Sequence, residues 1–148
     1  MTSHVFHEIY LHFNWHTKND APLITPRLEP VIHSYIRDRI VQTDGVFFHR
    51  IGGTETHIHL VINVTPALLL SEFIGQLKGA CSHDINAMEG AKVLDWQRGY
   101  GVVSFAKSQL AWVLRYVDLQ KDHHAHGTLS PRLELSADEL LRGGGEAG

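Results

Sequence analysis

Two histidines with the spacing of a metal-binding pair lie in the segment ETHIHLVINV, residues 55–64. Apolar residues occupy nearly every second position of this segment, which predicts a β-strand with His57 and His59 on one face. Side chains at positions i and i+2 of a strand are ~6–7 Å apart at the backbone, so both imidazoles could converge on one ion. Taken alone, the pair fits an ordinary solvated strand face at least as well.

A second candidate group lies downstream, in SQLAWVLRYVDLQKDHH, residues 108–124. The apolar positions recur with helical spacing and predict one helix from about residue 108 to 123. Its core-facing stripe consists of Leu110, Val113, Leu114 and Val117. Tyr116 and Gln120 lie beside that stripe at positions i and i+4, where side chains touch. This helix alone favours a simpler interpretation, with Tyr116 in the core and Gln120 on the surface.

The strand pair and the helix pair together predict a metal site with a nucleophile beside it. A free phenol has a pKa of about 10, so a tyrosine oxygen needs help to attack at neutral pH. A divalent cation gives that help by neutralising a phosphate oxygen. Two neutral imidazoles and one amide oxygen add no charge to the cation, which therefore keeps its charge for a phosphodiester.

The elements that position these groups follow the order β-α-β-β-α-β-α. Strands are expected at residues 5–17, 46–51 and 56–64, with short strands at 93–96 and 100–105. Helices are expected from Thr25-Pro26, from Ser71 and from about residue 108, and Gly52-Gly53 is expected to form a tight hairpin turn. This order predicts an α+β, ferredoxin-like (RRM-like) fold, with one antiparallel sheet and two helices on one face. The last helix, which carries Tyr116, is additional to that plan.

Length and composition predict one domain, residues 1–130, followed by an acidic and flexible tail at residues 131–148. The 148-residue chain is 43% hydrophobic, enough to bury a core, and has one cysteine, Cys81, so no internal disulfide forms. We find neither a signal peptide nor an apolar run of the ~18 residues that a membrane span needs. The formal net charge of −3 argues against a strongly basic nucleic-acid binder, so DNA binding would need a local basic patch or a metal ion.

The two motifs resemble those of a known family. HIH followed by LVI resembles the HUH motif (His, hydrophobic, His) of single-tyrosine endonucleases. YVDLQKDHH resembles the Tyr-x-x-x-Gln-x-x-His-His segment of insertion-sequence-two-hundred-like and REP-associated tyrosine transposases. The likeness covers about residues 5–127 and includes Leu77-Lys78-Gly79 and the segment at 96–101. Two positions depart from the family pattern: Thr56 replaces a usually acidic residue, and Leu119 replaces a frequent asparagine.

This resemblance implies an enzyme that cuts and rejoins single-stranded DNA at the ends of a mobile element through a 5′-phosphotyrosine intermediate. Tyr116 would be the nucleophile. His57, His59 and Gln120 would bind Mg²⁺ or Mn²⁺.

The family resemblance also implies partners and a location. The DNA partner would be a single strand with hairpin ends, contacted by Lys78, Arg98, His123 and His124. The protein would be a homodimer, and the sequence leaves open whether each active site is assembled in cis or in trans. A bacterial or archaeal cytoplasm, with nucleoid association during action, is the expected location.

The same residues argue against three other functions. A histidine-triad hydrolase needs a third histidine where Val61 stands, and a replication initiator would usually have lysine where Gln120 stands. A structural zinc site would want four ligands, preferably with cysteines. A domesticated relative, or a non-catalytic module that binds single-stranded nucleic acid, is the main alternative. Such a module would leave the histidine pair, Tyr116 and Gln120 without a role.

Overall fold

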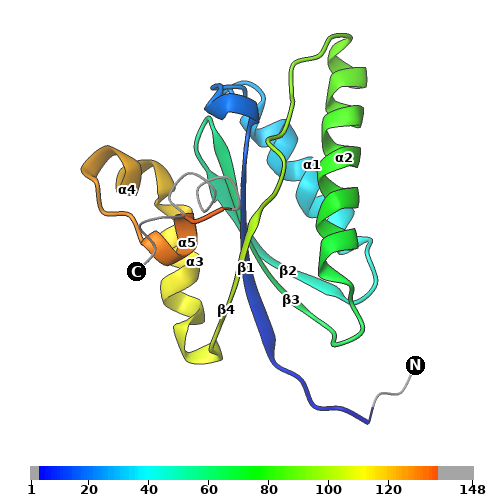
Figure 1. Cartoon of the computed structure of the whole chain (residues 1–148), viewed down its shortest axis with the longest axis vertical. Coiled ribbons are helices and arrows are strands. Elements are labelled where there is room, and N and C mark those ends of the chain that lie inside the picture. The colour runs from blue at the N-terminus through cyan, green and yellow to red at the C-terminus, as the bar shows by residue number, and fades with distance from the viewer. Residues whose placement is uncertain (1–3, 137–148) are drawn as a thin grey trace.

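A four-stranded antiparallel sheet forms the centre of the computed structural model, which describes residues 4–136 (Figure 1). Its strands are β1 (Ile9–His16), β2 (Val46–Gly53), β3 (His57–Val64) and β4 (Gly101–Phe105), in the order β2-β3-β1-β4. The main helices are α1 (Glu29–Val41), α2 (Leu70–Glu89), α3 (Leu110–Asp118), α4 (Gln120–His126) and α5 (Pro131–Glu134). Short 3₁₀ turns lie at Lys18–Asp20 and Lys107–Gln109. The predicted α+β, ferredoxin-like arrangement is confirmed.

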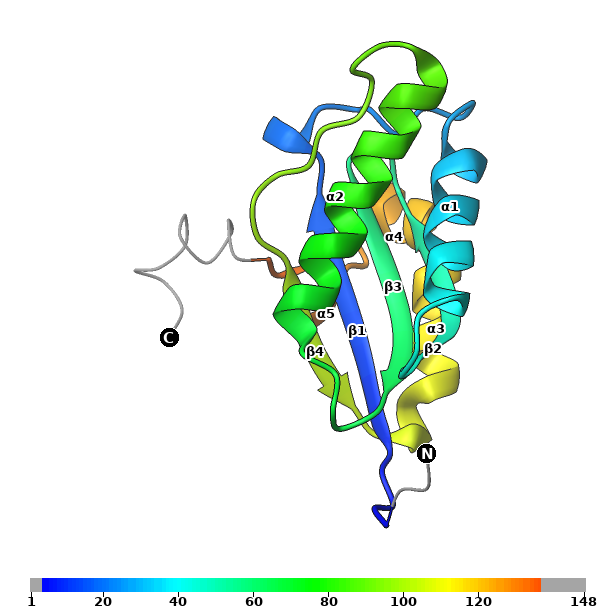
Figure 2. The same ribbon diagram turned by 90° about the vertical axis from the view of Figure 1, so that its right-hand side faces the viewer.

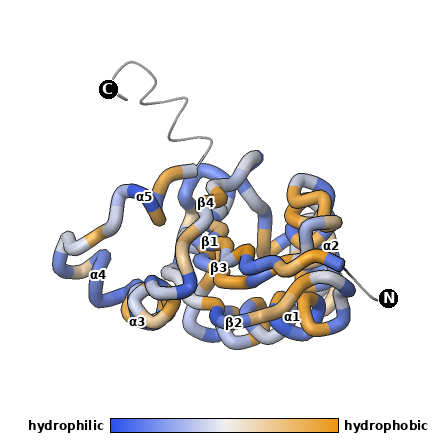
Figure 3. The backbone as a smooth tube through the Cα atoms, turned by 90° about the horizontal axis from the view of Figure 1, so that it is seen from below, coloured by the Kyte–Doolittle hydropathy of each residue, from blue (hydrophilic) through white to orange (hydrophobic). Residues whose placement is uncertain are grey.

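The sheet separates two helical layers. Helices α1 and α2 cover one face, and α3, α4 and α5 lie on the other (Figures 1 and 2). The larger core lies under α1 and α2, where Figure 3 shows strongly hydrophobic segments meeting β1 and β3, whereas α4 is hydrophilic. Ile58, Leu60 and Ile62 of β3 belong to this core. Because successive strand residues point to opposite faces, His57, His59 and Val61 point toward α3.

The predicted helix at 108–123 is two helices, with a break at Leu119 (φ −103°, ψ 25°). The side-chain amide of Gln120 donates to the carbonyl of Tyr116 at 3.3 Å. In a continuous helix that carbonyl would accept the backbone N–H of Gln120. A side chain that bonds to a nearby backbone group competes with the helix in this way. Tyr116 is therefore near the end of α3, and Gln120 opens α4.

The strand predicted at 93–96 is reduced to a single bridge between Thr17 and Trp96. The side chain of Asn86 in α2 provides the physical reason. Its Oδ1 accepts from the backbone N–H groups of Val93 and Leu94, each at 2.8 Å, and its Nδ2 donates to the carbonyl of Leu94 at 2.9 Å. These backbone groups are satisfied by a side chain and do not need a neighbouring strand.

The first residues of the expected flexible tail pack against the sheet. Leu133 of α5 is 2% exposed. Asn14 Nδ2 donates to the carbonyls of Leu133 and Leu135, at 3.0 and 2.8 Å. The boundary predicted at residue 130 therefore differs from the structure, because burial of Leu133 and these two bonds keep residues 131–136 in the folded unit. The remainder of the predicted tail, residues 137–148, lies outside the described residues.

The predicted Gly52-Gly53 turn is also different, because both glycines lie in β2 and the chain turns at residues 54–56. Gly52 instead allows helix α3 to approach strand β2 closely. A Cβ at this position would lie 2.4 Å from the carbonyl oxygen of Val117, so α3 can rest on β2 only because residue 52 has no side chain. None of the helices in the described part of the chain is long and apolar enough to cross a membrane.

We expect Gly52→Ala to lower the free energy of unfolding by about 1–3 kcal/mol, because the added methyl group overpacks the contact between β2 and α3. Urea denaturation followed by circular dichroism measures the loss. Gly75→Ala is the matched control, since a Cβ at this helical position meets nothing within 4 Å. Equal unfolding midpoints for the two variants would contradict the close approach of α3 to β2.

Candidate active site

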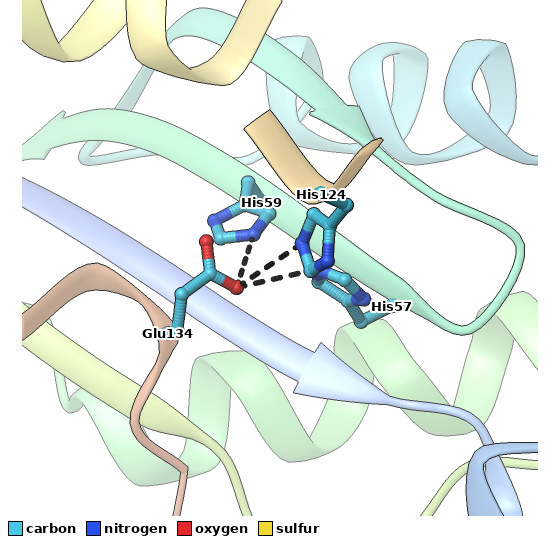
Figure 4. A group of neighbouring side chains, drawn as sticks. All are labelled: His57, His59, His124 and Glu134. Atoms are coloured by element: carbon cyan, nitrogen blue, oxygen red, sulfur yellow. Dashed lines mark ion pairs between the residues drawn. The ribbon is translucent and has the colours of Figure 1, made fainter. Parts of the chain in front are cut away.

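Four side chains from three elements meet on the sheet face that carries α3, α4 and α5 (Figure 4). His57 and His59 come from β3, His124 from α4 and Glu134 from α5. One nitrogen or oxygen atom from each lies within 4.8 Å of the corresponding atoms of the others. Glu134 Oε1 lies 3.4 Å from His57 Nε2, 3.3 Å from His59 Nε2 and 3.5 Å from His124 Nε2. We call these four residues the His₃Glu cluster.

The two β3 imidazoles have the character of metal ligands. His57 and His59 are 2% and 0% exposed, and the buried Nε2 atom of each has no hydrogen bond of normal geometry. A buried polar atom without a partner is costly, and a bound cation would remove that cost. Imidazole nitrogen and carboxylate oxygen are common ligands of divalent cations. The cluster therefore fits a divalent ion.

Hydrogen bonds behind the two imidazoles set their orientation. His59 Nδ1 lies 2.7 Å from His12 Nε2, and His57 Nδ1 lies 3.0 Å from Thr54 Oγ1 and 3.1 Å from Thr56 Oγ1. For Nε2 to offer a lone pair to a cation, Nδ1 must carry the proton and donate it to these neighbours. Burial lowers the pKa of His59 to about 4, against the opposing effect of Glu134. His59 is thus neutral at pH 7, as a ligand must be.

Sequence reasoning missed His12, although a signal was available. His12 is opposite Val61 in the pairing of β1 with β3, so it faces the same side of the sheet as His57 and His59. It is 1% exposed, and burial, with His59 as the next cause, lowers its pKa well below the usual value. In a ferredoxin-like sheet β1 lies beside β3, so the polar residues on one face of β1 are expected next to His57 and His59.

The phenol of Tyr116 touches the same carboxylate as the histidines. Tyr116 Oη donates a short hydrogen bond to Glu134 Oε2 and accepts one from the backbone N–H of Ser130 at 2.9 Å. Its ring stacks on Trp112 and His123, with centroid distances of 5.5 and 4.6 Å. Burial first, and then the bond to Glu134, raise the pKa of Tyr116 to about 12. The phenol is therefore held rigidly, in its protonated form.

Glu134 was missed at the sequence level, because it falls in the segment expected to be a flexible tail. Burial alone would raise the pKa of its carboxyl, but the contacts with His57, His59 and Tyr116 lower it below the usual range. The carboxylate is thus ionised and joins Tyr116 to the His₃Glu cluster.

Comparison with protein families identifies the chain. The family model described as "Transposase IS200 like" matches residues 5–120. The chain belongs to the IS200-like transposase family.

Two solved structures share the fold of this IS200-like transposase. A candidate transposase from Deinococcus radiodurans R1 is 18% identical, with a TM-score of 0.63, and the match covers 81% of this chain and 96% of that one. A REP-associated tyrosine transposase solved with a REP hairpin is 12% identical, with a TM-score of 0.60, and the match covers 97% of this chain and 87% of that one. A comparison with curated proteins gives no match.

The structure brings Tyr116, His57 and His59 of this IS200-like transposase together, and places Gln120 at the margin of the cluster. Gln120 is 1% exposed, and its Oε1 lies 3.1 Å from His124 Nε2. Adjacent ligands of an octahedral cation at ~2.1 Å are about 3.0 Å apart. Gln120 therefore stays a predicted ligand. His124, predicted to contact DNA, is the additional histidine of the cluster.

The remaining predicted DNA contacts lie in different surroundings. Lys78 belongs to α2, on the opposite face of the sheet from the cluster, and its Nζ donates to the carbonyls of Gln97 and Gly99 at 2.9 and 2.7 Å. Burial lowers its pKa to about 8. Lys78 thus holds the loop that presents the exposed Arg98. His123 Nδ1 lies 2.8 Å from Thr128 Oγ1, and its ring supports Tyr116.

We expect His12→Leu to weaken Mn²⁺ binding ~10–100-fold, because His59 loses the acceptor that fixes its proton on Nδ1. His12→Gln keeps an acceptor and should lose less affinity. Isothermal titration calorimetry with Mn²⁺ measures both effects, and His83→Leu, at an exposed position of α2, is the control. If His12→Leu binds Mn²⁺ as the parent does and melts at the same temperature, His12 does not orient His59.

Proposed function

We propose that this IS200-like transposase cleaves and rejoins single-stranded DNA through a 5′-phosphotyrosine intermediate on Tyr116, with Mg²⁺ or Mn²⁺ held by His57, His59 and Gln120. One observation carries the proposal: a single carboxylate, Glu134, contacts both the phenol of Tyr116 and three imidazoles. The phenol and the candidate cation site are therefore separated by the width of one carboxylate. A phosphodiester group is of similar size and could contact both.

In the proposed reaction Tyr116 Oη forms a bond to phosphorus, and the bond from phosphorus to O3′ breaks. The phenol proton leaves to solvent, and O3′ takes up a proton to become a free 3′-OH. A bound divalent cation would neutralise charge on a phosphate oxygen. The stacked rings of Trp112 and His123 hold the phenol in one orientation, which reduces the entropy lost in reaching the transition state.

The phosphotyrosine link conserves the energy of the cleaved bond. A 3′-OH can attack it, release Tyr116 and reseal the DNA without ATP. The proposed substrate is a single strand with hairpin ends at a mobile element, which is supported by the resemblance and by the REP hairpin bound to one of the similar structures.

The geometry of one chain supports assembly of the active site in cis. The ring of Tyr116 lies 6.0 Å from the ring of His59 in the same chain, and Gly52 lets α3 rest directly on β2. The homodimer implied by the resemblance remains part of the proposal, with each chain carrying its own Tyr116 beside its own histidines.

We expect a covalent protein–DNA adduct when the protein is mixed with Mn²⁺ and single-stranded oligonucleotides from imperfect palindromes beside its gene. Denaturing gel electrophoresis with end-labelled DNA detects it. Tyr116→Phe should form no adduct, because it lacks the attacking oxygen, and His59→Ala should lose adduct formation with the cation site. Tyr35→Phe, which removes a phenol that bonds to Asp84 far from the cluster, should react normally.

Two outcomes would point elsewhere. An adduct in Tyr116→Phe would show that another residue is the nucleophile. DNA binding without an adduct in the parent protein would favour the alternative, a non-catalytic or domesticated module that binds single-stranded nucleic acid.

A further inference from the structure

We propose that Trp112 stacks on the base of the nucleotide directly 3′ of the cleaved phosphate, and that Arg115 binds the next phosphate of the same strand. We call this nucleotide the tethered nucleotide, because its 5′-phosphate becomes bonded to Tyr116. The inference rests on the proposed function and identifies the residues that hold a part of the substrate which neither the nucleophile nor the cation site contacts.

Trp112 belongs to a stack of three aromatic rings that includes the nucleophile. The rings of Trp112 and Tyr116 are 5.5 Å apart with their planes at 19°, and the rings of Tyr116 and His123 are 4.6 Å apart with their planes at 22°. Tyr116 is 3% exposed, whereas Trp112 is 49% exposed. Single exposed apolar side chains are ordinary on protein surfaces, but this one is in contact with the attacking residue. The stack therefore carries an accessible aromatic ring next to a buried phenol.

The geometry of in-line attack selects the tethered nucleotide as the occupant of this ring. When Tyr116 Oη attacks phosphorus, O3′ leaves from the opposite side, so the strand that carries O3′ runs away from the phenol. The bond from phosphorus to O5′ lies to the side of this axis. The tethered strand can therefore fold back along helix α3, and its first base can reach the ring of Trp112.

Arg115 provides a positive charge beside this ring. It follows Trp112 by three residues in α3, a spacing at which side chains on a helix are neighbours, and it is exposed. Among residues 4–136, no carboxylate pairs with its guanidinium. A guanidinium without an acidic partner suits a phosphate, which it can bind through two parallel hydrogen bonds.

Two neighbouring cations differ from Arg115 in this respect. Arg50 Nη1 lies 2.8 Å from Asp118 Oδ2, and Lys121 Nζ lies 2.8 Å from Glu29 Oε2. Their charges are already matched by carboxylates, so Arg115 is the cation of α3 that can take a phosphate without losing an ion pair. An aromatic ring for a base and a cation for the backbone is the combination that binds single-stranded nucleic acid, and it tolerates any base because every base has a π-face.

Stacking on Trp112 has a consequence for the rejoining step. After cleavage, only the tethered strand is covalently bound, and rotation about its bonds to Tyr116 could turn the phosphorus away from an incoming 3′-OH. A base held on Trp112 and a phosphate held on Arg115 would fix that strand at two points. The side of phosphorus opposite Tyr116 Oη then stays open to attack, which reduces the entropy lost in the second reaction.

The test uses a 5′-phosphorylated dinucleotide with 2-aminopurine as its first base, the full-length protein and Mn²⁺. This probe has the phosphate, first base and second phosphate of the tethered strand, and its binding needs no cleavage. Stacking on an indole ring quenches 2-aminopurine fluorescence. We expect Trp112→Leu to bind the probe about tenfold more weakly and to quench it less, because the base loses its stacking partner. Trp112→Phe keeps a ring and should recover most of the affinity.

Two controls separate the base and phosphate contacts from indirect effects. A dinucleotide without its first base, measured by competition, should bind equally to the parent and to Trp112→Leu. Arg115→Gln should weaken binding of both dinucleotides and leave the quenching at saturation unchanged. Arg37→Gln removes the same charge from an exposed position of α1, where Arg37 pairs with Asp38, and should bind as the parent does.

Three results would overturn the proposal. If Trp112→Leu loses the same affinity for the dinucleotide without its first base, Trp112 acts only by supporting Tyr116. If Trp112→Leu binds and quenches the probe as the parent does, the base lies elsewhere. If Arg115→Gln matches Arg37→Gln, Arg115 does not bind the phosphate. Failure of the proposed function looks different: the parent forms no covalent adduct with DNA, although quenching of the probe still depends on Trp112.

Discussion

The period of two along β3 is the constraint on which the rest of the structure depends. Ile58, Leu60 and Ile62 are fixed in the core under α1 and α2, so the intervening His57 and His59 must point into the opposite layer. A slip of one residue would turn the imidazoles into the apolar core and the isoleucines toward the layer of α3 and α4. The same burial that stabilises the fold therefore holds the two imidazoles in register, without any contribution from a ligand.

A strand with neighbours on both sides is a rigid support for such groups. β3 lies between β1 and β2, and each neighbour helps to orient one imidazole: His12 of β1 contacts His59, and Thr54, directly after β2, contacts His57. Burial of a polar nitrogen costs free energy unless the nitrogen has a hydrogen-bond partner. In His57 and His59 the Nδ1 atom has such a partner, and the Nε2 atom has none. The Nε2 atoms face the cluster with that cost unrelieved, so the fold itself favours a cation at this point.

Local pattern was sufficient for the central strands and the fold class, because each depends on periodicity within one segment at a time. The grouping of Tyr116 with the histidine strand required two motifs from separate segments. Local pattern was insufficient where a side chain four to eight residues away takes the place of a backbone hydrogen-bond partner. Asn86 removes the need for a strand at 93–96, and the amide of Gln120 breaks the last helix. Helix α5 had a usable signal in Ser130-Pro131, since proline favours the first turn of a helix. The contacts of Glu134 had none, because they exist only after the sheet has assembled.

The position of Glu134 in the site affects how the net negative charge of the chain bears on DNA binding. A protein with a formal net charge of −3 gains little from general attraction to DNA. Its active site, however, already holds one anionic group among three imidazoles and a phenol. A phosphodiester that bridged Tyr116 and the histidines would meet the negative charge of Glu134 there, so a bound divalent cation would have to offset both charges.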